Sequence, residues 1–202
     1  MSKAVLISIR PKWCQKIASD EKTIEVRKTR PKLETPFKCY IYCTRDKHLA
    51  FMQNASGTNL IACMNAETAI PVGGFLGNGK VIGEFTCDQI YKIDKDSTDF
   101  LFKVGGLSVY KQAAEEKCGL CVAMTDDELH GYLGHCQGYG WHISDLRIYD
   151  TPRELSEFQR ATDPCDSCHT EYTWECTDCK KLGGDIKRPP QSWCYVEAKR
   201  DG

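Results

Sequence analysis

Ile17-Ala-Ser-Asp-Glu-Lys-Thr-Ile-Glu-Val-Arg27 is the stretch on which the interpretation of this chain depends. Between Lys22 and Lys28 apolar and polar residues alternate, which predicts a strand that directs Ile24 and Val26 to one side. The opposite side then carries a hydroxyl, a carboxylate and a guanidinium, from Thr23, Glu25 and Arg27. Together with the lysine that starts the strand, these groups can bind phosphate and accept a hydrogen bond or a proton. A surface ion pair without a function is the alternative interpretation.

The residues before this strand predict another strand and a short helix. Lys3–Ile9 alternates β-branched and other residues, and Pro11 suits the first turn of a helix. We expect the helix to bring Arg10 and Lys12, at the end of the first strand, close to the start of the next one. Residues 1–32 carry nine Lys or Arg against three acids, a net charge of +6. This excess can attract phosphate, although an uneven charge on a solvated surface also accounts for it.

The remaining pattern predicts the fold class. Alternating segments predict strands at 37–43, 81–87, 141–149 and 192–198, and two capping boxes predict short helices after Thr125 and Thr151. Short strands interrupted by turns favour an α+β fold, a small mixed β-barrel with short flanking helices, over a doubly wound parallel sheet. We expect one domain over residues 1–202. Three segments are expected to be insertions: 44–78, 94–124 and a cysteine-rich zinc-binding segment at 163–188.

The overall composition is that of a globular protein, with 41% hydrophobic and 27% charged residues. No apolar run approaches the roughly 20 residues that a membrane span needs, so we expect no membrane association. The N-terminal residues lack the small-residue cleavage site of a signal peptide. The 13 cysteines are an odd number, which favours free thiols in a reducing compartment. We therefore expect a cytoplasmic protein.

The segment Asp20-Glu-Lys22-Thr-Ile-Glu25-Val-Arg27 resembles the motif of the ASCH domain family, G-x-K-x-x-E-x-R. The lysine, glutamate and arginine match, and Asp20 stands at the turn position of the glycine, where aspartate is tolerated. Other segments also resemble the strands of this family: Ser8–Pro11, Gly79–Glu84, Gly140–Leu146 and the segment around Trp193.

This resemblance implies a function as well as a fold. The ASCH family is similar to PUA domains, which are β-barrels that bind RNA, so we expect an RNA, nucleotide or nucleoside ligand in a basic cleft. The residues expected to contact it are Arg10, Lys12, Lys22, Thr23, Glu25, Arg27 and Trp141. Trp141 is included because an indole can stack on a base, although such residues more often fill a barrel core.

Catalysis is the alternative that the resemblance leaves open. Some relatives are hydrolases that act on acylated cytidine or on RNA, and the amidohydrolases among them use a lysine and a threonine of this strand with a distant glutamate. Lys22 matches the lysine, whereas Glu25 stands where the threonine is expected. If this chain is an enzyme, the catalytic residues are expected to be Lys22, as nucleophile activator or charge stabiliser, and Glu25, as acid or base.

A separate motif predicts a metal site. Cys165-x2-Cys168 and Cys176-x2-Cys179 can place four thiolates around one structural zinc ion, with four free thiols as the alternative. The spacing leaves open whether a second site forms from Cys118, Cys121 and Cys136. A third functional hypothesis follows, in which the zinc segment docks a protein partner and the barrel is merely structural.

The zinc hypothesis predicts about one zinc ion per chain in elemental analysis of the purified protein. Changing Cys165 and Cys168 to Ser should remove the metal and lower the free energy of unfolding, because a structural site contributes to folding. A metal-free wild-type protein with the same stability as the zinc-treated protein would contradict this hypothesis.

Overall fold

The computed structural model describes residues 3–64, 69–95, 102–104, 107–108, 121–134, 136–161 and 184–198. Its contacts divide the chain into two compact units, and each is described by itself. Unit 1 comprises Met1–Gln15, Lys38–Phe85 and Arg147–Gly202, and unit 2 comprises Lys16–Phe37 and Thr86–Leu146. No helix among the described residues is both long and apolar enough to cross a bilayer.

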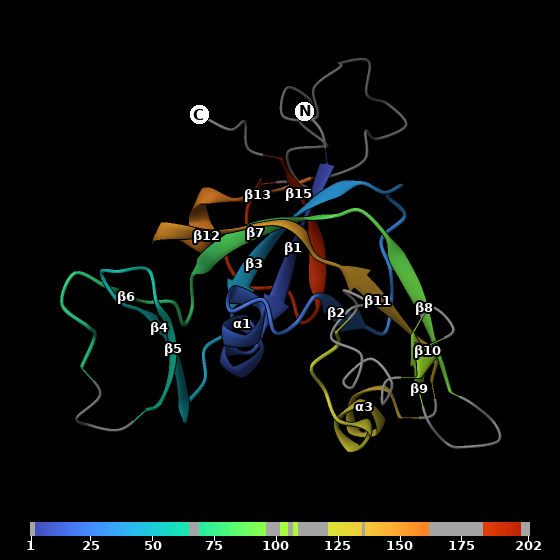
Figure 1. The fold of residues 1–202 in the computed structure, drawn as a ribbon. Coiled ribbons are helices and arrows are strands. Elements are labelled where there is room, and N and C mark those ends of the chain that lie inside the picture. Colours follow the sequence, from blue (N-terminus) through green and yellow to red (C-terminus); the bar gives the residue numbers. More distant parts are fainter. Residues whose placement is uncertain are drawn as a thin grey trace, which may run out of the picture. The chain divides into compact units, whose positions relative to one another are not determined.

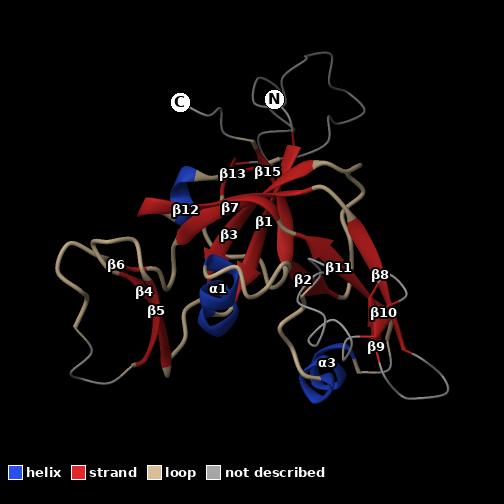
Figure 2. Cartoon of the chain, viewed as in Figure 1, coloured by secondary structure: helices blue, strands red, loops and turns tan. Residues whose placement is uncertain are grey.

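The described elements are mostly short strands (Figures 1 and 2). The strands of the first half are β1 (Lys3–Ile9), β2 (Ile24–Arg27), β3 (Phe37–Cys43), β4 (Leu49–Gln53), β5 (Asn59–Cys63), β6 (Phe75–Leu76), β7 (Val81–Cys87) and β8 (Ile90–Lys95). Those of the second half are β9 (Phe102–Val104), β10 (Leu107–Ser108), β11 (Gly138–His142), β12 (Ser144–Arg153), β13 (Gln159–Arg160), β14 (Gly184–Asp185) and β15 (Trp193–Glu197). The helices are α1 (Pro11–Ala18), α3 (Asp126–Leu133) and the 3₁₀ helix η1 (Leu155–Glu157).

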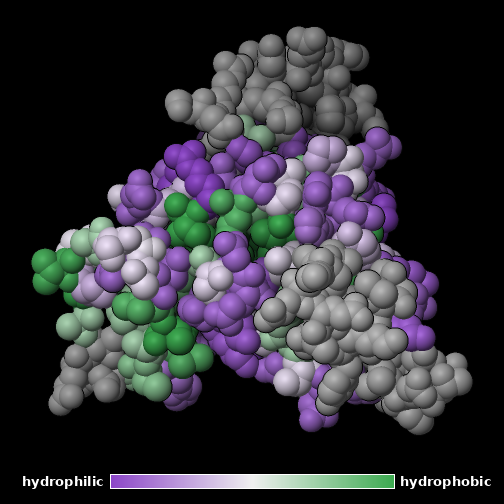
Figure 3. Space-filling model, viewed as in Figure 1, coloured by the Kyte–Doolittle hydropathy of each residue, from purple (hydrophilic) through white to green (hydrophobic). Residues whose placement is uncertain are grey.

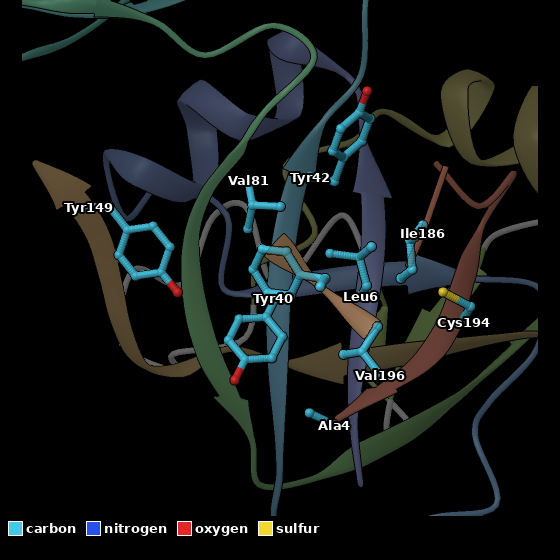
Figure 4. Close-up of a cluster of buried hydrophobic side chains, with 10 residues drawn as sticks. Ala4, Leu6, Tyr40, Tyr42, Val81, Tyr149, Ile186, Cys194 and Val196 are labelled. Atoms are coloured by element: carbon cyan, nitrogen blue, oxygen red, sulfur yellow. The ribbon is translucent and has the colours of Figure 1, made fainter. Parts of the chain in front are cut away.

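Unit 1 is built on a seven-stranded mixed sheet with the order β12-β7-β3-β1-β15-β13-β14. Its central strand β1 pairs parallel with β3 and antiparallel with β15. Alternate residues of β1 and β3 face one buried cluster, which Figure 4 shows as interlocking side chains. The members of this cluster are Ala4, Leu6, Tyr40, Tyr42, Val81, Tyr149, Phe158, Ile186, Cys194 and Val196. Tyr149 is fixed in it by a hydrogen bond of 2.6 Å that its hydroxyl donates to Glu84.

A three-stranded sheet, with the order β5-β4-β6, also belongs to unit 1. Its strand β4 is largely buried, whereas β5 is largely exposed. The exposed large hydrophobic residues of the described chain all fall between residues 60 and 72, in the excursion that contains β5, and hydrophobic colour gathers over this part of the molecule in Figure 3. They are Leu60, Ile61, Met64, Ile70 and Val72.

Unit 2 is built on an antiparallel sheet with the order β10-β9-β8-β11-β2. Alternate side chains of β2 face a buried cluster, to which helix α3 contributes Leu129 and Leu133. The other members of this cluster are Ile24, Val26, Ile93, Val104 and Val122. Ile24 and Val26 therefore face the core, as the alternation predicts, and the next residues along the strand face the other way.

The α+β class is confirmed, as are the strands expected at 3–9, 37–43 and 81–87. The capping box after Thr125 is also confirmed, since the Thr125 hydroxyl accepts from the backbone N–H of Glu128 at 3.2 Å. The helix expected from Thr151 to Phe158 is wrong, because β12 runs through Arg153 and only a 3₁₀ turn follows. The barrel is not seen as such: pairing among the described strands closes none of the three sheets.

Gly140 in β11 lets this strand pack closely against β2. A Cβ atom at this position would lie 2.7 Å from Cγ2 of Ile24, which belongs to a stiff, buried side chain. We expect Gly140→Ala to lower the free energy of unfolding by about 1–3 kcal/mol through overpacking. Gly131→Ala is the matched control, because a Cβ there meets nothing within 4 Å and alanine favours the helix. Urea unfolding of both variants tests this, and equal stability of the two would contradict it.

Candidate functional site

The side chains of Lys22, Glu25 and Arg27 meet in unit 2 and are called the charged cluster below. Arg27 Nη2 lies 2.9 Å from Glu25 Oε1, and Lys22 Nζ lies 3.7 Å from Glu25 Oε2. Strand alternation accounts for the pairing of Glu25 with Arg27, which are two residues apart on one face of β2. The structure therefore brings together the three residues that match the ASCH motif.

The charged cluster is buried, which corrects the expectation of an exposed outer face. Lys22 is 2% exposed, and Glu25 and Arg27 are each 5% exposed. Strand β2 is covered on the side that alternation assigns to solvent, because a sheet strand can be buried on both faces. The three charges consequently interact in an environment where water screens them little. The alternative of a solvent-exposed surface ion pair is excluded for these residues.

Lys22 is held by a backbone group far away in the sequence. Its Nζ donates a hydrogen bond of 2.6 Å to the carbonyl oxygen of Val122, 100 residues further on. Burial lowers the pKa of the Lys22 amine below its ordinary value, and the nearby Glu25 carboxylate opposes this shift. The neutral form of Lys22 is therefore easier to reach than that of an exposed lysine.

Glu25 has one satisfied and one less satisfied oxygen. Oε1 accepts from Arg27, whereas Oε2 is buried and has no hydrogen-bond partner within the described part of the chain. A buried carboxylate oxygen costs free energy unless a donor is supplied. This oxygen is therefore the group of the charged cluster best suited to accept a hydrogen bond from a ligand.

Thr23 binds the segment that also contacts Lys22. Its hydroxyl accepts from the backbone N–H of Cys121 at 2.7 Å, and the N–H groups of Thr23 and Ile24 both donate to the Cys121 carbonyl at 2.9 Å. These three bonds join Thr23 and Ile24 to Cys121, next to the Val122 carbonyl that binds Lys22. The Thr23 hydroxyl, which the sequence predicts to contact a ligand, thus binds the backbone of Cys121 in this structure.

Trp141 packs within the protein. It is 0% exposed, pairs across the sheet with Glu25, and meets Phe37 edge to face with ring centroids 5.8 Å apart. An indole buried in this way offers no free face for a base. Trp141 is therefore a core residue in this structure, as the alternative interpretation has it, and it is not placed to stack on a ligand.

Arg10 and Lys12 belong to unit 1, and both side chains are exposed.

The predicted zinc ligands lie outside the described residues, as does Cys118. These ligands are Cys165, Cys168, Cys176 and Cys179. Cys121 is half-buried and Cys136 is exposed. The described ranges contain no group of three or more His, Cys, Asp or Glu side chains placed to bind a metal.

Two features of unit 2 have no signal in the sequence. The carbonyl of Val122 is a backbone group, so residue types say nothing about its role. His142 Nδ1 lies 2.6 Å from Asp88 Oδ1, although these residues are 54 positions apart. Only the pairing of β11 with β8 and β2 brings such segments together.

The buried amine of Lys22 predicts a specific pH dependence of stability. Because burial lowers its pKa in the folded state below 10.5, the unfolded chain binds a proton that the folded chain releases in the window just below that value. The contribution of Lys22 to the free energy of unfolding therefore rises with pH through this window. Lys22→Met should abolish that rise, whereas the exposed Lys28→Met should keep it. Urea unfolding between pH 7 and 10 measures both, and an unchanged slope in Lys22→Met would disprove the assignment.

No protein-family model and no curated protein matches this sequence. Solved structures of the ASCH protein from Zymomonas mobilis and of two of its point mutants are similar to it, each at 15% sequence identity with a TM-score of 0.50. For the first of them the similarity covers 96% of this chain and 87% of the other. For one mutant the figures are 97% and 91%. At this identity the comparison shows the fold alone, and it agrees with the motif at Asp20–Arg27: the chain has the fold of the ASCH domain.

Proposed function

We propose that this protein binds RNA or a nucleotide, and that the charged cluster recognises the ligand. The observation that carries the proposal is the burial of two cations and a carboxylate at one place in unit 2. Burying such charges is costly, and apolar residues of similar volume often stabilise a fold as well or better. A buried charge cluster with a shifted lysine is therefore better explained by a ligand than by stability.

The fold supports a nucleic-acid or nucleotide ligand by analogy, since the resemblance to ASCH and PUA domains is what suggests RNA. The chemistry of the site is compatible with it. Glu25 Oε2 can accept a hydrogen bond from the amino group of a base, as carboxylates do from cytosine. Arg27 and Lys22 lie 2.9 and 3.7 Å from this carboxylate and hold it in place. Glu25 is 5% exposed, so access of a ligand requires a local movement, and we propose that the Cys121–Val122 segment, which binds Lys22 and Thr23, makes it.

Phosphate binding falls to the exposed cations rather than to the charged cluster. Arg10 and Lys12 are exposed, whereas Lys22 and Arg27 already bind Glu25. Exposed Arg and Lys side chains neutralise phosphates and release counterions, which makes affinity depend on salt. Recognition of a base is thus assigned to Glu25 in unit 2, and phosphate binding is assigned to Arg10 and Lys12 in unit 1.

Hydrolysis of an acylated cytidine or of RNA is the second candidate function. It is favoured by the lowered pKa of Lys22, because a neutral amine can act as a nucleophile or a base. Docking of a protein partner through residues 163–188 is a third hypothesis, which rests on the cysteine spacing alone.

The phosphate-binding role predicts a change in salt dependence. The double variant Arg10→Gln/Lys12→Gln should bind single-stranded RNA more weakly, and the slope of log K against log salt should shrink by about 1.4, at roughly 0.7 per lost contact. Arg147→Gln/Arg160→Gln removes the same charge from exposed positions of unit 1 and should leave the slope unchanged. Weak wild-type binding without salt dependence would overturn the proposal.

Glu25→Gln separates binding from catalysis. A binding protein should bind more weakly and show no turnover before or after the change, because the amide has one acceptor oxygen where the carboxylate offers one to Arg27 and one to the ligand. A hydrolase that needs Glu25 as a proton acceptor should bind but lose turnover by about 10²-fold or more. The assay measures binding and hydrolysis of single-stranded RNA and of N-acylated cytidine, with Glu21→Gln as an exposed control. Wild-type turnover on either substrate would favour the hydrolase over the binding module.

A further inference from the structure

Unit 1 carries four exposed cations at one edge of its sheet, called the basic edge below. Strands β1 and β3 run parallel, with Ile9 beside Cys43, so the segments that follow them start at the same edge. The backbone N–H of Thr44 donates to the carbonyl of Ile9 at 2.8 Å, which ties these segments together. The exposed Arg and Lys side chains of these two segments are Arg10, Lys12, Arg45 and Lys47.

The loop after β3 has a defined conformation. Asp46 Oδ1 accepts the backbone N–H groups of His48 and Leu49 at 2.7 and 3.0 Å. Arg45 lies over the backbone of Gly79, where a Cβ atom would come within 3.1 Å of its Nε. The loop therefore presents Arg45 from a fixed backbone. Asp46 is the one acid within residues 10–12 and 45–48, so four cations leave a net charge of +3 there.

The charge environment of Asp46 links the two segments. Hydrogen bonds from the backbone of His48 and Leu49 lower the pKa of Asp46, and the charge of Arg10, from the other segment, lowers it further. Since Arg10 follows β1 and Asp46 follows β3, the charge of one segment acts on the other.

We infer that the basic edge binds the sugar–phosphate backbone of a single-stranded polynucleotide, and that the ligand of this protein is a polymer rather than a mononucleotide. The inference rests on the proposed function. Exposed cations hold a single small anion weakly, because water and salt screen each pair. A polynucleotide differs, since every neutralised phosphate releases condensed counterions and adds to affinity. Four cations spread over two segments suit several successive phosphates better than one.

Arg45 and Lys47 provide the test, because the resemblance to the ASCH motif does not involve them. Fluorescence anisotropy compares a labelled 12-nucleotide single-stranded RNA with cytidine monophosphate as competitor, using the full-length protein. Arg45→Gln/Lys47→Gln should shrink the salt slope for the 12-mer by about 1.4, while the concentration of cytidine monophosphate that competes stays within about twofold. Arg45→Lys/Lys47→Arg should retain wild-type binding, which separates a loss of charge from a loss of fold.

The outcomes distinguish this inference from the proposed function. If the wild-type protein binds the 12-mer and Arg45→Gln/Lys47→Gln behaves like the control Arg147→Gln/Arg160→Gln, the inference fails and the proposed function stands. If cytidine monophosphate displaces the 12-mer at concentrations close to the dissociation constant of the 12-mer, the ligand is a mononucleotide and the inference also fails. If the wild-type protein binds neither ligand, both are overturned.

Discussion

The contact between the Lys22 amine and the Val122 carbonyl is the interaction on which the candidate site depends. It joins the residue two positions before β2 to a segment 100 residues further along the chain, and the same amine lies 3.7 Å from the carboxylate that Arg27 also binds. Three backbone and hydroxyl hydrogen bonds between Thr23, Ile24 and Cys121 reinforce it. Because a buried charge must be paired, the position of Glu25 and the position of the Cys121–Val122 segment are mutually dependent.

Much of the fold followed from local pattern. Alternation correctly predicted β1, β3 and β7, because one face of each strand meets a continuous core. Strand β5 gave no such signal, since the adjacent Leu60 and Ile61 are both exposed. The capping box at Thr151 was overridden, because the pairing of β12 continues through Arg153 and an ion pair of 2.9 Å joins Lys80 to Glu154. Tertiary pairing outweighed a local helix-start signal there.

The residues of the site were predictable, but their environment was not. The motif identified Lys22, Glu25 and Arg27 as a group, and the structure brings them together. All three are buried, and Lys22 is held by the backbone carbonyl of Val122, a group without a residue-type signature. This burial changes their chemistry, because it shifts the pKa of Lys22 and leaves a carboxylate oxygen available to a donor. Exposed cations such as Arg10 and Arg45 are therefore the residues for which we propose phosphate binding.

If a nucleic-acid ligand engages the charged cluster, the Cys121–Val122 segment, whose carbonyl binds Lys22, should respond to it. Hydrogen–deuterium exchange, with and without a saturating single-stranded RNA, tests it most directly. The amides of Thr23 and Ile24 donate to the Cys121 carbonyl, so they report whether this segment moves. We expect RNA binding to change the exchange rates of the Thr23 and Ile24 amides. Exchange that stays the same throughout unit 2 while RNA is bound would contradict it.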